Sequence, residues 1–364
     1  MAPPSDRSVR RRILLAGLAS MGLLVLLRTL PASTEGREQL REAAHWMDRG
    51  IQAAREAREA RGIRIDPSAD PNGTGLIGPE ISPLVTTVGS LESKRTATSP
   101  EMAVVTAWML RRAGAEPGET VAVGASGSFP GLLTAVLSAC RALDAEPAVI
   151  LSLGASSWGA AHPDFHLLDL HGTLREAGLT DRPPLAVSVG GEGDEGGGLD
   201  RAVVDGLREE VLDAGIPLIE EPDLQRNATL RLHYYQEAAG GGKPAAFVNI
   251  GGAWANMGTS EVALGLRPGL NTHVRRPPPG QGGVVHAMAA RRVPVIHLLH
   301  LRGLTARYGL QWDPVPLPHP EEPGVYRRLA PLPTLFRVAL AAYLLCLAGL
   351  AVVPLPRGSH RSRG

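Results

Sequence analysis

The sequence is poor in cysteine. Only two of its 364 residues are cysteines, Cys140 and Cys346, and their separation fits neither a metal-ligand pair nor a redox motif. Lys and Arg (37) nearly balance Asp and Glu (36), so the overall charge gives no sign of a nucleic-acid partner. No G-x-x-x-x-G-K-[ST] motif occurs, which excludes a P-loop synthetase. We therefore expect no cofactor, no metal ion and no nucleic acid.

Two apolar runs near the ends predict membrane-spanning helices. Residues 13–27 (ILLAGLASMGLLVLL) follow three arginines, and snorkelling of Arg28 brings the segment near the roughly 20 residues that a span needs. A cleavable signal peptide is the alternative, but no clear A-x-A site follows, so we expect an uncleaved span over 13–32. Residues 338–353 (VALAAYLLCLAGLAVV) predict a second span over 334–355, with a buried core helix as the alternative.

The arginines predict how such a protein would lie in the lipid bilayer. Four arginines within residues 1–12 place the N-terminus in the cytoplasm by the positive-inside rule. A second span returns the basic tail, residues 356–364, to the same side. We therefore expect a two-pass protein of the cell membrane whose main domain lies outside the cytoplasm, where ATP and NAD are not readily supplied.

Between the two runs, the pattern predicts an α/β domain over 89–312. Residues 33–88 precede it as an amphipathic helix (37–61) and a loop, and a Pro-rich linker (313–333) follows it. A helix is expected from Ser99 to about Ala113. Short apolar runs then alternate with helical stretches such as 131–145 and 200–215, which predicts a three-layer, mostly parallel sheet. The expected strands, about six, are 120–124, 148–154, 185–190, 216–220, 245–251 and 293–299.

The loop after the first of these strands, GASGSFPG at 124–131, has three open interpretations. It fits the nucleophile elbow G-x-S-x-G except that Ser128 replaces the last glycine, so Ser126 or Ser128 is a candidate nucleophile. A general base would then be needed, and the candidates are His162, His166 and His286. Converging amides at a helix N-terminus suit an anion equally well. The third interpretation is a plain strand-to-helix turn.

Other glycine-rich strand ends are candidate ligand-binding loops, because ligands of open α/β sheets bind beyond the carboxyl ends of the strands. SLESKRTATSPE (90–101) offers two adjacent cations, with a solvated loop as the alternative. NIGGAWANMG (249–258) offers amides that both donate and accept, and Arg275 and Arg276 follow. The expected ligand-binding residues are Lys94, Arg95, Gly124, Ser126, Gly127, Ser128, Ser156, Asn249, Gly251, Gly252 and Asn256.

The segment HPDFHLLDLH (162–171) contains residue types that bind metals. His162, His166 and Asp169 would share one face if the segment were helical. No glutamate follows the first histidine, as it does in the zinc motif H-E-x-x-H. We therefore interpret these side chains as partly exposed helix residues and expect no metal here.

Four segments taken together, SLESKRTATSP, VAVGASGSFPG, LSLGASSWGAAHPDF and VNIGGAWANMG, resemble the bacterial poly-γ-glutamate system protein family over about residues 89–300. The resemblance implies a role in making, exporting or retaining poly-γ-glutamate, beside the membrane subunits that make it, and implies no catalytic residue. We expect a membrane-anchored accessory protein that binds the polymer or a partner subunit. The alternatives are an exported serine-dependent γ-glutamyl hydrolase or transferase, and a domain whose surface serves assembly only.

Overall fold

The computed structural model describes residues 6–29, 36–259, 265–321, 323–329 and 334–352. The chain forms two compact units. One comprises Glu38–Leu329 and holds the strands, and the other joins Met1–Arg37 to Ala330–Gly364. The predicted helix and loop before residue 89 and the Pro-rich linker up to Leu329 are therefore parts of the same unit as the sheet.

The second unit contains α1 (Asp6–Thr29) and α14 (Thr334–Val352), whose side chains meet where Ser20 Oγ lies 2.6 Å from Tyr343 Oη. The apolar part of α1, residues 13–27, is about 22 Å long at 1.5 Å per residue. A bilayer has about 30 Å of hydrocarbon. Within the ranges that the structure describes, no helix combines the length and the apolar character that a membrane crossing requires. The two-pass location, with spans over 13–32 and 334–355, is therefore wrong as judged on the described residues; 30–32 and 353–355 lie outside them.

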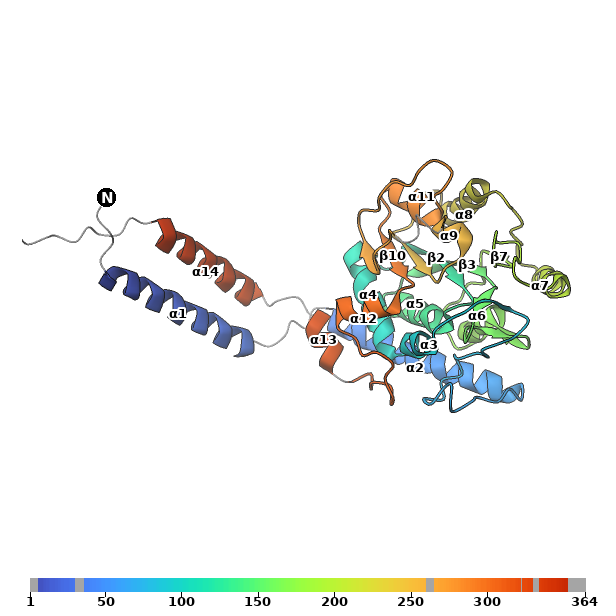
Figure 1. Cartoon of the computed structure of the whole chain (residues 1–364), viewed down its shortest axis with the longest axis horizontal. Helices are drawn as coiled ribbons and strands as arrows, with labels where there is room; N and C mark the ends of the chain where they lie inside the picture. The colour runs from blue at the N-terminus through green and yellow to red at the C-terminus, as the bar shows by residue number, and fades with distance from the viewer. Residues whose placement is uncertain (1–5, 30–35, 260–264, 322, 330–333, 353–364) are drawn as a thin grey trace, which may run out of the picture. The chain divides into compact units, whose positions relative to one another are not determined.

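A six-stranded mixed sheet forms the centre of the larger unit, in the order β7-β3-β2-β8-β10-β9 (Figure 1). Five strands are parallel, and β9 pairs antiparallel with β10. The strands are β2 (Thr120–Ser126), β3 (Glu146–Ser152), β7 (Ala186–Ser188), β8 (Ala246–Ile250), β9 (Gly269–Asn271) and β10 (Val295–Leu298). Two small pairs lie outside it: β1 (Val85–Thr87) with β4 (Ala155–Ser156), and β5 (Ala161–His162) with β6 (Phe165–His166).

The α/β prediction is confirmed, with one strand exchanged. Five of the expected strands are present, but 216–220 contributes only one bridge, from Leu218 to Val187. The sixth strand is β9, which has three residues and no apolar run that a sequence pattern would reveal. The buried strands are rich in β-branched and small residues because helices cover both faces of the sheet.

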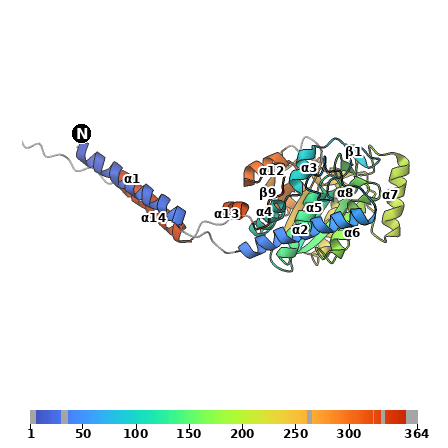
Figure 2. The same cartoon turned by 90° about the horizontal axis from the view of Figure 1, so that it is seen from below.

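Two groups of helices cover the sheet (Figure 1). One core cluster joins it to α4 and α5, and a second joins the opposite face to α8 and α11. α2 packs on α5 and α6, where Gly50 lies against Thr134 and Leu174 (Figure 2). Among the described residues, the helices of this unit are α2 (Arg37–Ala60), α3 (Leu91–Ala97), α4 (Pro100–Ala113), α5 (Pro130–Ala142), α6 (Leu167–Glu176), α7 (Arg201–Asp213), α8 (Leu224–Ala238), α9 (Trp254–Met257), α11 (Val284–Ala290), α12 (Leu301–Tyr308) and α13 (Pro323–Leu329).

Candidate functional site

The strand order reverses between β2 and β8, because the chain runs from β2 outward to β3 and β7 and then returns to place β8 on the other side of β2. Open α/β sheets bind ligands in the crevice at such a switch point. The loops that meet there are 127–129 after β2 and 251–253 after β8. A Cβ added at Gly251 would overlap Ser126 Oγ, so these two predicted residues lie in direct contact. The structure therefore brings Gly124, Ser126, Asn249, Gly251 and Asn256 together, as the strand-end rule predicts.

Polar atoms without hydrogen-bond partners gather at this point. Among the described residues, buried atoms of this kind include Ser126 Oγ, Asn249 Oδ1 and both side-chain polar atoms of Asn256. The Asn249 amide nitrogen is engaged with Gly251 O (2.9 Å) and His297 Nδ1 (3.1 Å). Burial lowers the pKa of His297 to about 4, so its ring is neutral at pH 7. Unpaired buried groups of this kind are rare in proteins and mark places where water or a ligand completes the bonding.

A row of serines extends from this cluster across the sheet. Ser126, Ser152 and Ser188 are register partners on three adjacent strands, so their side chains share one face. Ser188 Oγ donates to Asp194 Oδ1 (2.7 Å) in the glycine-rich loop after β7, and Arg231 Nη2 of α8 donates to Asp194 Oδ2 (2.6 Å). The pair is buried, and Asp194 adopts φ 65° inside a run of glycines. Neither member of this pair was among the expected site residues.

Lys94 lies in α3, with its side chain buried against the loop that follows β2. Its Nζ donates to the Ser128 carbonyl, lies 2.6 Å from Ser156 Oγ and stands 3.9 Å from the centre of the Phe129 ring. In the part of the chain that the structure describes, it forms no ion pair with a carboxylate, and burial lowers its pKa to about 7. The expected residues Lys94, Ser128 and Ser156 are therefore together, but Lys94 is held inside and is not presented to solvent.

Arg95, the next residue of α3, already forms an ion pair with Asp313. Its Nε donates to Asp313 Oδ1 (2.6 Å), and its Nη2 to Asp313 Oδ2, in a two-point ion pair. The Asp313 hydrogen bond raises the pKa of Arg95 further. The proposed role of Arg95 in binding an anion therefore requires Asp313 to be displaced first.

The Lys94 burial gives a testable dependence of stability on pH. The folded chain releases the proton near pH 7, whereas an exposed lysine keeps it to about pH 10.4. Between these values the unfolded chain binds more protons, so stability rises with pH, by about 2 kcal/mol from pH 7 to pH 9. Urea unfolding of the wild type should show this rise, and Lys94→Met should remove it. A parallel pH dependence in both proteins would contradict the assignment.

The histidines proposed as general bases lie elsewhere. Among the described residues, none is hydrogen-bonded to Ser126 or Ser128. His162 Nδ1 accepts from Asp164 N (3.2 Å), and His286 Nδ1 accepts from Gly283 N (3.2 Å) at the start of α11. With Arg275 and Arg276, His286 lines a separate cavity of about 540 Å³ beside α8.

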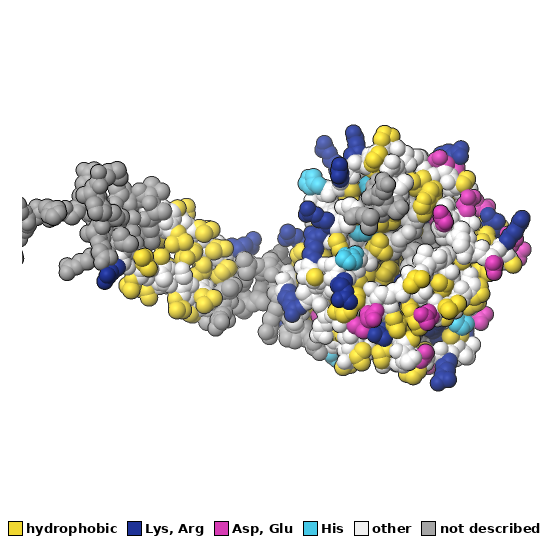
Figure 3. All heavy atoms as spheres, in the orientation of Figure 1, with side chains coloured by type: hydrophobic (Ala, Val, Ile, Leu, Met, Phe, Trp, Pro, Cys, Tyr) yellow, Lys and Arg dark blue, Asp and Glu magenta, His cyan; other side chains and the backbone are white. Residues whose placement is uncertain are grey.

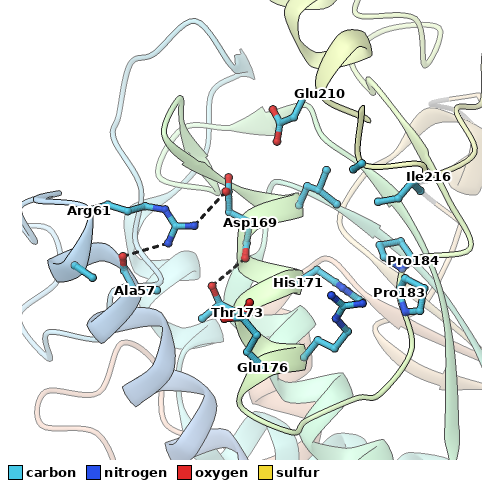
Figure 4. A pocket seen from close by; sticks show the side chains of 15 residues that line it. Ala57, Arg61, Asp169, His171, Thr173, Glu176, Pro183, Pro184, Glu210 and Ile216 are labelled. Carbon is cyan, nitrogen blue, oxygen red and sulfur yellow. Dashed lines mark hydrogen bonds and ion pairs between the residues drawn. The ribbon is translucent and has the colours of Figure 1, made fainter. Parts of the chain in front are cut away.

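The segment 162–171 is not one helix, because β5 and β6 form a short hairpin and α6 begins only at Leu167. His166 caps this helix, with Nδ1 accepting from Leu168 N (3.3 Å), and its Nε2 lies 2.8 Å from Glu210. His166, Asp169 and Glu210 bring three possible metal ligands within 4.8 Å of one another. Figure 4 shows Asp169 facing Arg61 beside a cavity of about 570 Å³. The helix cap formed by His166 and the ion pairs of Asp169 with Arg61 and of His166 with Glu210 explain why these side chains lie together, without a metal ion.

Three arginines line another cavity, of about 650 Å³, formed by α4, α12, α13 and residues near β9. Arg112 lies over the Trp108 ring and Arg307 over the Tyr308 ring, and Arg328 joins them from α13. None of the three pairs with an acidic side chain within the described ranges. Figure 3 shows Lys and Arg gathered on the side of the domain that carries these helices, and many Asp and Glu towards α7 and α8. This arginine cavity was not predicted, because its residues are far apart in sequence.

Comparison with known proteins gives no match: no protein-family model, no curated protein and no solved structure matches this chain.

Proposed function

We propose that this chain is an accessory protein of poly-γ-glutamate synthesis or export that binds the polymer through the arginine cavity. The observation that carries the proposal is a cavity lined by three arginines without acidic partners among the described residues. A γ-linked glutamate chain carries one free α-carboxylate per residue. Guanidinium groups bind carboxylates through two parallel hydrogen bonds, so the cavity suits successive carboxylates of one chain.

Aromatic rings support the arginines in this arrangement. Stacking of Arg112 on Trp108 (5.4 Å from the guanidinium carbon to the ring centre) and of Arg307 on Tyr308 (5.5 Å) limits their movement. Arg307 is also fixed by donating to Pro268 O (2.6 Å). Less side-chain entropy is therefore lost when the carboxylates bind. The sequence predicts Lys94 and Arg95 as the cations of the ligand site, but both already have partners inside the fold.

A binding measurement with the full chain tests the proposal. Fluorescently labelled poly-γ-glutamate should bind the wild type with an affinity that falls as salt is raised, because exposed charges are screened. A variant combining Arg112→Gln, Arg307→Gln and Arg328→Gln should bind on the order of tenfold more weakly, given roughly 0.2–1 kcal/mol for each exposed charge contact. Anisotropy titration measures both.

Three other exposed arginines make a matched control, since Arg182, Arg201 and Arg226 pair with Glu146, Asp205 and Glu221. Changing these three to glutamine removes the same net charge and should leave the affinity within about twofold. Equal weakening by both triple variants would show a general charge effect and would contradict a site at the arginine cavity. Equal affinity for poly-α-glutamate would contradict recognition of the γ-linkage.

A further inference from the structure

The buried Lys94 amine has contacts that define where its proton and lone pair point. Lys94 is 3 % exposed, and Ser156 is 8 % exposed. The Ser128 carbonyl can only accept, so one N–H of the amine points to it. The face of the Phe129 ring, 3.9 Å away, attracts a second N–H. A neutral amine has two N–H groups and one lone pair, and the remaining neighbour is Ser156 Oγ at 2.6 Å. In the charged form Lys94 Nζ donates to Ser156 Oγ; once the amine has lost that proton, its lone pair faces Ser156 Oγ and can accept the hydroxyl proton.

Three loops are held close together around this pair. The Ser156 backbone N–H donates to Ser128 Oγ (3.1 Å), which ties the loop after β3 to the loop after β2. Gly89, before α3, lies so close to Ser156 Oγ that an added Cβ would stand 2.9 Å from it and 3.1 Å from Lys94 Cε. Ser128 is partly exposed and lies in the loop after β2, near Gly251: a Cβ added at Gly251 would stand 3.6 Å from Ser128 Cβ. The arrangement is therefore built by several elements and is not a chance surface contact.

We propose that Ser156 is a nucleophile and Lys94 its general base, in a serine–lysine pair that transfers acyl groups from amides or esters. Ser156 Oγ forms a bond to the acyl carbon while its proton passes to Lys94 Nζ. Collapse of the tetrahedral intermediate breaks the bond to the amine or alcohol, which leaves with that proton. Water then attacks the Ser156 ester, again giving a proton to Lys94, and the acid is released as the serine regains its hydrogen. No cofactor enters this sequence. The inference does not depend on polymer binding at the arginine cavity.

Covalent labelling of the full chain with a fluorophosphonate tests this assignment. The probe forms a bond from the nucleophilic serine oxygen to phosphorus and releases fluoride, so peptide mapping should place the adduct on Ser156. The labelling rate should rise through pH 7, where Lys94 loses its proton. Ser156→Ala should abolish labelling, and Lys94→Met should slow it on the order of 100-fold, as loss of a general base does.

Two serine variants serve as controls, because Ser126 and Ser128 are the other hydroxyls beside the crevice. Ser126→Ala and Ser128→Ala should both keep the adduct on Ser156. An adduct on Ser128 or Ser126, or no adduct on the wild type, would overturn the proposal. So would a Lys94→Met rate equal to that of the wild type. If Lys94→Met fails to fold by circular dichroism, the pH profile of the wild-type rate decides, and a profile flat from pH 6 to pH 8 overturns the role of Lys94.

Discussion

Replacing Arg231 with methionine is expected to lower the free energy of unfolding by about 3 to 5 kcal/mol, as loss of one partner of a buried ion pair does. The Arg231 and Asp194 side chains are 0 % and 1 % exposed. Without the guanidinium, the Asp194 carboxylate would stay buried with hydrogen bonds only from neutral groups, such as Ser188 Oγ (2.7 Å) and Asn227 Nδ2 (3.1 Å). Equilibrium unfolding in urea measures the loss.

An exposed ion pair provides the matched control. Arg226 lies on the same helix, is 72 % exposed in its side chain and pairs with Glu221 at 3.3 Å. Arg226→Met should change the stability by less than about 1 kcal/mol. Adding Asp194→Asn to Arg231→Met should restore part of the loss, because the uncompensated charge is removed. A similar small loss for both arginine variants would show that the buried pair contributes little.

The second large effect is expected from Gly131→Ala at the start of α5, with a loss of about 3 kcal/mol from overpacking. A Cβ at this position would stand 2.6 Å from Ala97 O and 3.0 Å from Thr98 N, both backbone atoms at the end of α3. The end of α3 must therefore move away from α5. Because Lys94 lies in α3 and Ser128 just before α5, the contact between them should lengthen, and labelling of Ser156 should slow together with the loss of stability.

Gly172 gives the comparison for Gly131→Ala, since it too lies in a helix, α6, but an added Cβ there meets nothing within 4 Å. Gly172→Ala should raise the stability by about 0.5–1 kcal/mol, the ordinary gain in a helix interior, and leave labelling unchanged. Thermal unfolding and the labelling assay report on both variants. A tolerated Gly131→Ala would mean that α3 is free to shift without cost.

The sequence predicted the class of fold and the edge of the sheet where the candidate residues meet, because both follow from local patterns. Apolar runs with helices between them define the parallel strands, and Ser126 and Asn249 lie at strand ends that must share one edge. The position of the switch point could not be predicted, because it depends on the order of the strands in the sheet, and local sequence patterns do not reveal that order.

The ion pairs around the site could not be predicted from local sequence patterns. Arg231 lies 37 residues from Asp194, and Arg95 lies 218 residues from Asp313, so only the folded chain shows which charges are neutralised. The predicted membrane spans failed for a different reason: the apolar runs were recognised, but their length was extended across flanking arginines such as Arg28 and Arg337. The apolar composition of the runs favoured the prediction, although the runs are shorter than the hydrocarbon layer of a bilayer is thick.

The strand order also has a consequence during synthesis. β2 is central in the finished sheet, but its neighbour β8 begins only at Ala246, long after β2, β3 and β7 have left the ribosome. Until then one side of β2 is an open edge of unpaired amides and carbonyls on an apolar strand, which is a template for aggregation. A chain interrupted before Ala246 keeps that edge open permanently, so truncated copies should collect in insoluble material or with chaperones, whereas full-length copies close it.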